Sequence, residues 1–148
     1  MKTKVLIFLI AVAVISGSCS EFNDTTNYSD FLEPVKDLSG EWIITSALRN
    51  GQDISNLMDV TNFRLHLRLD GTYTIETDLP FLVQTGGQWS TDDPQFPFTL
   101  TFRENSANAS VSCALVYPIV NGVRQIQLSF SPGCFRNTYT YFFVNENL

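Results

Sequence analysis

The basic side chains Arg64, His66 and Arg68 lie close together in this 148-residue sequence, and His66 is its only histidine. They alternate with Leu65 and Leu67. Guanidinium groups suit carboxylates and phosphates, so the row could bind an anion, or it could be the solvated face of a strand. No serine or cysteine with a nucleophile motif accompanies His66. We therefore expect no catalytic residues and no enzyme activity.

Carboxylates are the second group of residues with possible chemistry. Asp92 and Asp93 are adjacent, and Asp53 and Asp59 lie six residues apart. Their spacing matches no calcium-binding loop. We interpret them as residues that cap turns and short helices.

Cys113 and Cys134 are the cysteines in the body of the chain. They have no His or carboxylate companions at ligand spacing, so we expect no metal site and no cofactor. If residues 114–117 and 124–130 form neighbouring strands, Cys113 comes within a few residues of Cys134. Either a disulfide or two free thiols is consistent with this arrangement.

The first eighteen residues have the layout of a secretory signal. Lys2 and Lys4 precede an apolar run over residues 5–15, and small residues follow at 16–18. The run is too short to span a bilayer as a helix. The cysteine that follows, Cys19, resembles the lipidated cysteine of bacterial lipoproteins, although the serines before it would also suit an ordinary signal peptidase.

This resemblance implies an address in the cell envelope. We expect residues 1–18 to be a lipoprotein signal peptide, residues 19–36 a lipid-anchored leader, and residues 37–148 one folded domain. The partner of the anchor is then a membrane, and triacyl modification supplies enough chains to hold it stably. The expected localisation is that of an outer-membrane lipoprotein, facing the periplasm or exposed at the cell surface.

The charge of the chain limits its partners. It is −6 at pH 7 for the whole sequence, and about −8 once Lys2 and Lys4 are removed with the signal. A surface of this sign is a poor partner for nucleic acid.

The middle of the chain has the pattern of a β-hairpin. Leu65 and Leu67 alternate with polar residues, as a strand with one buried face requires. A two-residue turn would put the apolar residues of the two arms on opposite faces. A three-residue turn ending at a left-handed Gly71 instead places Leu67 opposite Tyr73 and Leu65 opposite Ile75.

The same alternation recurs along the chain and gives eight short strands with short connections. Two of these strands are expected over residues 81–91 and 96–103. The predicted fold is all-β: an antiparallel, eight-stranded, up-and-down β-barrel. At most one short helix is expected, between strands 1 and 2. It would begin at Asp53 and lie over an open end of the barrel, either as a lid or as a plug.

Short motifs at the expected strand starts give a family resemblance. Gly40-Glu41-Trp42 resembles the Gly-x-Trp signature of lipocalins and their calycin relatives. The stretch 67–73 and Gly87-x-Trp89 resemble bacterial lipocalin-like envelope domains of unknown function. This resemblance covers about residues 37–145 and implies a calycin-type barrel whose inward aromatic residues either line a ligand cavity or fill it.

Two functions follow from these expectations. The protein could carry a small apolar or amphipathic ligand inside the barrel, or it could be an interaction module, such as an inhibitor or accessory subunit, that binds another envelope protein. The candidate cavity residues are those predicted to point inward from the strands or from the short helix: Trp42, Leu57, Met58, Leu65, Leu67, Tyr73, Ile75, Trp89, Phe98, Phe102, Tyr117 and Tyr139.

Overall fold

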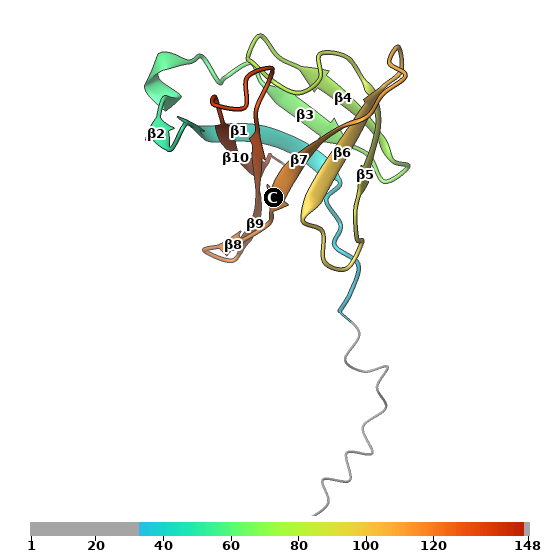
Figure 1. Ribbon diagram of the computed structural model, residues 1–148. Helices are drawn as coiled ribbons and strands as arrows, with labels where there is room; N and C mark the ends of the chain where they lie inside the picture. The colour runs from blue at the N-terminus through green and yellow to red at the C-terminus, as the bar shows by residue number, and fades with distance from the viewer. Residues whose placement is uncertain (1–32, 147–148) are drawn as a thin grey trace, which may run out of the picture. The chain divides into compact units, whose positions relative to one another are not determined.

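A computed structural model describes residues 33–146, so the predicted signal peptide, Cys19 and most of the leader lie outside the described residues. The compact part of the chain begins at Pro34, and it is all-β (Figure 1). Its elements in chain order are β1 (Gly40–Arg49), β2 (Gln52–Asp53), the 3-10 turn η2 (Ser55–Leu57), β3 (Arg64–Leu67), β4 (Thr72–Glu76), β5 (Gly87–Thr91), β6 (Thr99–Glu104), β7 (Val111–Val116), β8 (Ile119–Val120), β9 (Val123–Phe130) and β10 (Tyr139–Asn145).

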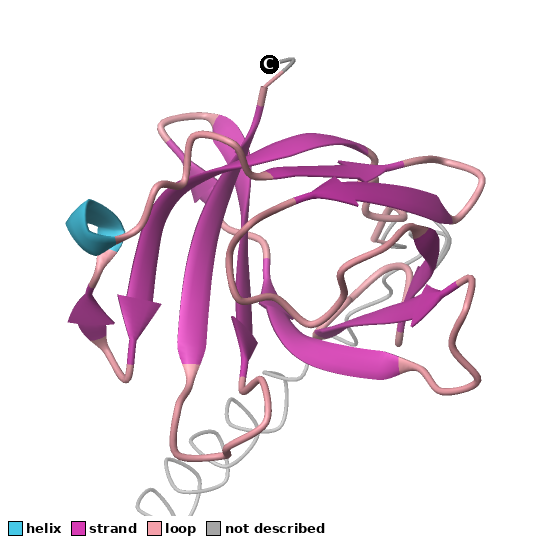
Figure 2. Ribbon diagram, turned by 90° about the horizontal axis from the view of Figure 1, so that it is seen from above, coloured by secondary structure: helices cyan, strands magenta, loops and turns pink. Residues whose placement is uncertain are grey.

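Eight strands close into an antiparallel barrel, as the alternation predicted. From β1 through β3, β4, β5, β6, β7 and β9 to β10, each strand pairs with the next, and β10 pairs back onto β1. Figure 2, seen from above, shows the strands curving around into a closed sheet. The two-residue strands β2 and β8 only extend β1 and β9. Closure gives the main strands neighbours on both sides and removes the unpaired edges of an open sheet.

The up-and-down order gives the barrel two ends with different connections. We call the end where β1 begins the base. It is formed by residues 34–39, the β3–β4 turn, the β5–β6 loop at 92–98 and the β7–β9 connection at 117–122. The other end, the top, is formed by the β1–β3, β4–β5, β6–β7 and β9–β10 connections.

The central hairpin has the predicted register. Leu67 lies opposite Tyr73 and Leu65 lies opposite Ile75. The amide of Gly71 donates to the carbonyl of Arg68 at 3.0 Å, and Gly71 has a φ of +80°. This is the bulged three-residue turn expected from the sequence, so both arms direct their apolar side chains into the barrel.

A cluster of aromatic rings fills the barrel interior. Phe81 lies at its centre, with ring centroids 5.3 Å from Phe63, 5.8 Å from Phe102 and 5.1 Å from Phe130, all in edge-to-face contact. The ring of Tyr141 stacks parallel to Phe81 at 6.4 Å. Edge-to-face and offset pairs at these spacings are the arrangements that aromatic rings prefer in a packed core.

The segment that brings Phe81 into this cluster is the β4–β5 connection, which folds into the top of the barrel. Phe81 and Val83 are both buried. The hydroxyl of Tyr141 donates to the carbonyl of Pro80 at 2.8 Å, which ties the connection to β10. The strand predicted over residues 81–91 therefore begins only at Gly87, because its first six residues form a plug instead.

The predicted short helix exists as the single turn η2, but it is not the plug. The carboxylate of Asp53 accepts a hydrogen bond from the amide of Ser55, and the hydroxyl of Ser55 accepts one from the amide of Ala47 on β1. Leu57 is 82% exposed, so the prediction that it faces a cavity is wrong. Met58 packs only partly against the core, because the β4–β5 connection already occupies the top.

Glu104, at the end of β6, fixes the plug from outside. Its carboxylate accepts hydrogen bonds from the amides of Gln84 at 2.7 Å and Thr85 at 2.8 Å. These two backbone hydrogen bonds hold the pKa of Glu104 below its ordinary value of 4.5. The ionised carboxylate therefore satisfies two loop donors next to the packed rings.

Replacing Gly71 tests the bulged turn. A Cβ at this position meets only the carbonyl oxygen of Trp89, at an ordinary 3.6 Å, so the penalty comes from the left-handed backbone. We expect Gly71→Val to lower the free energy of unfolding by about 1–3 kcal/mol. Asp70→Ala, in the same turn, should lower it less. Chemical denaturation measures both variants; equal midpoints would contradict the turn assignment, and Gly71→Asn should fall closer to wild type because Asn tolerates positive φ.

Replacing Glu104 with Gln tests the attachment of the plug. A carboxylate whose folded pKa is lowered stabilises the fold above its unfolded pKa, and this contribution is lost as the pH falls through the folded pKa. We therefore expect Glu104→Gln to be less stable than wild type at pH 7, with the difference shrinking as the pH drops below 4.5. Thermal unfolding over pH 3 to 7 measures this, and a difference independent of pH would contradict it.

Candidate functional site

The residues predicted to line a cavity are mostly part of the packed core. Trp42, Leu65, Leu67, Tyr73 and Phe102 are each no more than 1% exposed. Five others from the same prediction are partly buried and pack against this core: Met58, Ile75, Trp89, Tyr117 and Tyr139. The described pockets lie on the outside of the barrel, and the structure brings the predicted residues together as a core.

Phe98 is the second predicted cavity residue that faces the wrong way, with 67% of its surface exposed. The carboxylate of Asp92 accepts hydrogen bonds from the amides of Phe98 and Thr99, both at 3.0 Å. This arrangement interrupts the alternation, so β6 begins at Thr99, three residues after the predicted strand start. Pro97 is buried, whereas its neighbours Phe96 and Phe98 are exposed.

The hydroxyl of Tyr73 is the one buried side-chain oxygen or nitrogen without a hydrogen-bond partner among the described residues. Burial, and secondarily the negative charge of Glu104, raise the pKa of Tyr73 to about 12. The hydroxyl therefore stays neutral near pH 7. The Tyr73 ring contacts Phe102 at 5.0 Å, so the residue is held as part of the core.

The two cysteines are separate free thiols, so the disulfide considered from the sequence is not formed. The strand pairing expected between β7 and β9 is confirmed, and it places Cys113 on the inner face. Cys113 is buried, and burial raises the pKa of its thiol to about 12. Cys134 lies in the exposed β9–β10 connection. A buried thiol of raised pKa is a poor nucleophile.

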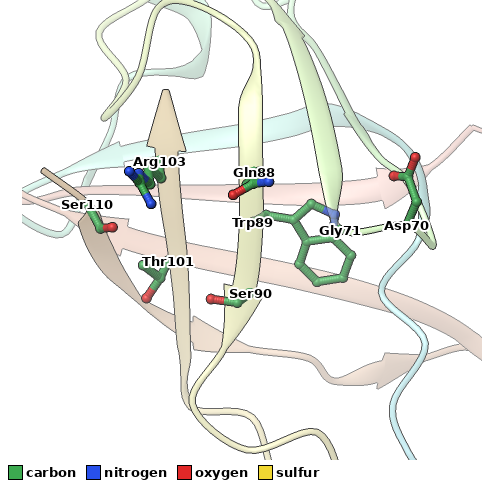
Figure 3. Close-up of a pocket in the computed structure, with 8 residues that line it drawn as sticks. All are labelled: Asp70, Gly71, Gln88, Trp89, Ser90, Thr101, Arg103 and Ser110. Carbon is green, nitrogen blue, oxygen red and sulfur yellow. The ribbon is translucent and has the colours of Figure 1, made fainter. Parts of the chain in front are cut away.

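A shallow groove of about 320 Å³ runs along the outside of β5 and β6 and reaches the β3–β4 turn (Figure 3). The residues that line it are Asp70, Gly71, Gln88, Trp89, Ser90, Thr101, Arg103 and Ser110. The indole of Trp89 donates to the carbonyl of Arg68 at 3.0 Å, which fixes the ring beside the turn. Neither serine in the lining has a histidine beside it there, so the groove offers hydrogen bonds and no nucleophile–base pair.

The basic row of β3 lies on the outer face, as one of the two sequence interpretations predicted. His66 is exposed and sits opposite Glu41 on β1 and Thr74 on β4. Arg64 lies 3.6 Å from a carboxylate oxygen of Glu41 and 3.4 Å from one of Glu146. These carboxylates offset the positive charge, so the row gives little support to an anion site.

The base carries exposed apolar residues that the sequence prediction missed. Of the eleven large hydrophobic side chains that are exposed in the described part, eight lie at the base: Val35, Leu69, Phe96, Phe98, Val116, Ile119, Val120 and Val123. Six of them lie on the β5–β6 loop and around the β7–β9 connection, and we call this set the apolar rim: Phe96, Phe98, Val116, Ile119, Val120 and Val123. The available signal was the placement of these residues beside Pro94, Pro97, Pro118 and Asn121-Gly122, where a buried strand is disfavoured.

Metal and membrane-spanning features were sought in residues 33–146. No group of three or more His, Cys, Asp or Glu side chains there is arranged to hold a metal ion. Nor does this part contain a helix long and apolar enough to cross a membrane.

One comparison with known proteins gave a match. Residues 20–144 match the family described as Domain of unknown function (DUF5004). Comparisons with curated proteins and with solved structures gave no match. The closed eight-stranded antiparallel barrel agrees in coarse terms with the lipocalin-like resemblance. Since the match spans most of the sequence, the chain belongs to the DUF5004 family.

Proposed function

We propose that this protein is a non-catalytic interaction module of the bacterial cell envelope. It is anchored through a lipid on Cys19 and binds a partner protein through the outside of its barrel. The observation that carries this proposal is the barrel interior filled by aromatic rings in mutual contact. Of the two functions considered from the sequence, a packed interior favours the interaction module over the carrier of a small ligand.

The size of the interior explains this preference. Small-molecule sites are concave spaces of about 300–1,000 Å³ that enclose most of the ligand. An eight-stranded barrel is just wide enough for its own side chains, unless these are small. Here Phe63, Phe81, Phe102, Phe130 and Tyr141 meet at its centre. Binding is therefore assigned to the outer surface, where the groove of Figure 3 presents hydrogen-bonding side chains.

The sequence supports the anchor and the location. A basic start, a short apolar run and small residues precede Cys19. A doubly or triply acylated cysteine holds a protein stably at a membrane, whereas a single chain does not. The acidic surface argues against nucleic acid as the partner.

Native mass spectrometry of the protein purified from its own host tests the function. We expect residues 19–148 to carry the mass of an acyl modification on Cys19 and no further small molecule, with a partner protein retained under gentle conditions. A Cys19→Ser variant is the control, because it should lack the lipid mass. A stoichiometric small apolar molecule bound to the folded chain would contradict the proposal.

Truncating Phe81 separates a packed interior from a ligand cavity. In a packed interior Phe81→Ala should lower the free energy of unfolding by about 3–5 kcal/mol, because transfer and cavity costs add. Phe135→Ala is the matched control, since Phe135 is 82% exposed and its one described ring contact is with Arg136. It should cost no more than about 1 kcal/mol. Chemical denaturation measures both, and similar small losses would show that Phe81 is not part of a close-packed core.

A further inference from the structure

We propose that the apolar rim at the base is a membrane-contact surface, which seats the barrel on the bilayer that holds the lipid of Cys19. This inference rests on the proposed function, because it needs the anchor. It adds an orientation: the base faces the lipid, and the groove along β5 and β6 lies on the side wall of the barrel, accessible to a partner.

The distribution of exposed apolar side chains is the first argument. Phe98 is 67% exposed, Ile119 62% and Val116 51%, and all three belong to the rim. The two parts of the rim adjoin, because the amide of Leu115, next to Val116 on β7, donates to the carbonyl of Phe98 at 2.8 Å. Extended apolar patches on soluble proteins mark interaction sites with proteins or membranes.

The path of the chain selects the membrane. The amide of Lys36 donates to the carbonyl of Pro94 at 2.8 Å, so the leader joins the barrel beside the loop that carries Phe96 and Phe98. In Figure 1 this segment leaves past the β5–β6 loop. Fifteen residues separate Pro34 from Cys19, and a chain of that length covers at most about 50 Å. The tether therefore starts at the base, so the base is the end of the barrel with the shortest chain path to the lipid on Cys19.

The β5–β6 loop also satisfies the backbone donors beside its two exposed Phe side chains. Asp93 accepts hydrogen bonds from the amides of Gln95 at 2.7 Å and Phe96 at 2.9 Å, and Asp92 accepts those of Phe98 and Thr99. A backbone donor without a partner is costly in lipid. These amide donors are satisfied within the loop. Its two Phe side chains can therefore enter the bilayer interface without leaving the amides unpaired in lipid.

The charges at the base indicate apolar and not electrostatic contact. Asp37, Asp70, Asp92 and Asp93 lie there together with Lys36, Arg68 and Arg124. The guanidinium of Arg124 donates to the carbonyl of Tyr117 and lies 5.4 Å from the centre of its ring. With both signs present, attraction to anionic lipid is weak. We therefore expect contact with neutral phosphatidylcholine that does not weaken at high salt.

Fluorescence quenching by lipid-borne nitroxides tests this orientation. The lipidated chain is placed in phosphatidylcholine vesicles with a fluorophore on one of two cysteines. Cys134, exposed at the top, reports the far end; Ile119→Cys in a Cys134→Ser background reports the rim. Cys113 is buried and should not react. We expect quenching several-fold stronger at position 119 than at position 134. It should fall to the level of position 134 when Phe96→Ser and Phe98→Ser are added.

The possible outcomes separate the two proposals. Equal quenching at both positions on a chain that carries the lipid would overturn the membrane-contact surface and leave the anchor intact. The membrane-contact surface would also be overturned by a second result. In that result, another protein shields the label at position 119 from an aqueous quencher, and the lipid-borne nitroxides do not quench it. Absence of lipid on Cys19 would overturn the proposed anchored function itself. Unfolding midpoints of the rim variants close to wild type show that loss of quenching does not come from loss of the fold.

Discussion

The close packing of aromatic rings inside a closed barrel is the constraint on which the rest of the structure depends. Closing eight strands leaves a space of nearly fixed width. The β4–β5 connection supplies Phe81 to the middle of that space, where it contacts rings from β6, β9 and β10. The Glu104 carboxylate and the Tyr141 hydroxyl hold this connection in place. The barrel interior is therefore filled by the protein's own side chains, which leaves the outer surface for the proposed binding.

The outer surface of the barrel differs in polarity between its walls and its base. The walls carry charged and hydroxyl side chains, such as Arg64 with its carboxylate neighbours and Thr101 hydrogen-bonded to Ser112. The base instead exposes Phe96, Phe98 and the apolar side chains around the β7–β9 connection. The polar wall and the apolar base are the two surfaces on which the proposed partner and membrane contacts rest.

Local patterns were enough to predict the strands and the register of the central hairpin. Alternation in β3 and β4, together with the left-handed Gly71, determined which side chains face inward, because both signals act over a few residues. The long-range features could not be predicted in this way. No local pattern shows that Phe81 leaves a strand to plug the top, which was one of the two roles considered for the turn near Leu57.

The errors at the candidate site have similar causes. Phe98 follows the alternation of β6 in the sequence, but the carboxylate of Asp92 takes its amide and turns the side chain outward. Cys113 lies on the inner face of β7 and is buried, whereas Cys134 lies in the exposed β9–β10 connection. In each case a hydrogen bond or a loop path, invisible in the residue pattern, decided the direction of the side chain.

A crystal structure of the protein purified from its own host is the most direct test of the central claim, which is that the barrel is filled by its own side chains. The account predicts electron density for the rings of Phe63, Phe81 and Tyr141 in contact, with no other molecule between them. Density for a bound molecule inside the barrel, with the β4–β5 connection displaced from the top, would contradict it.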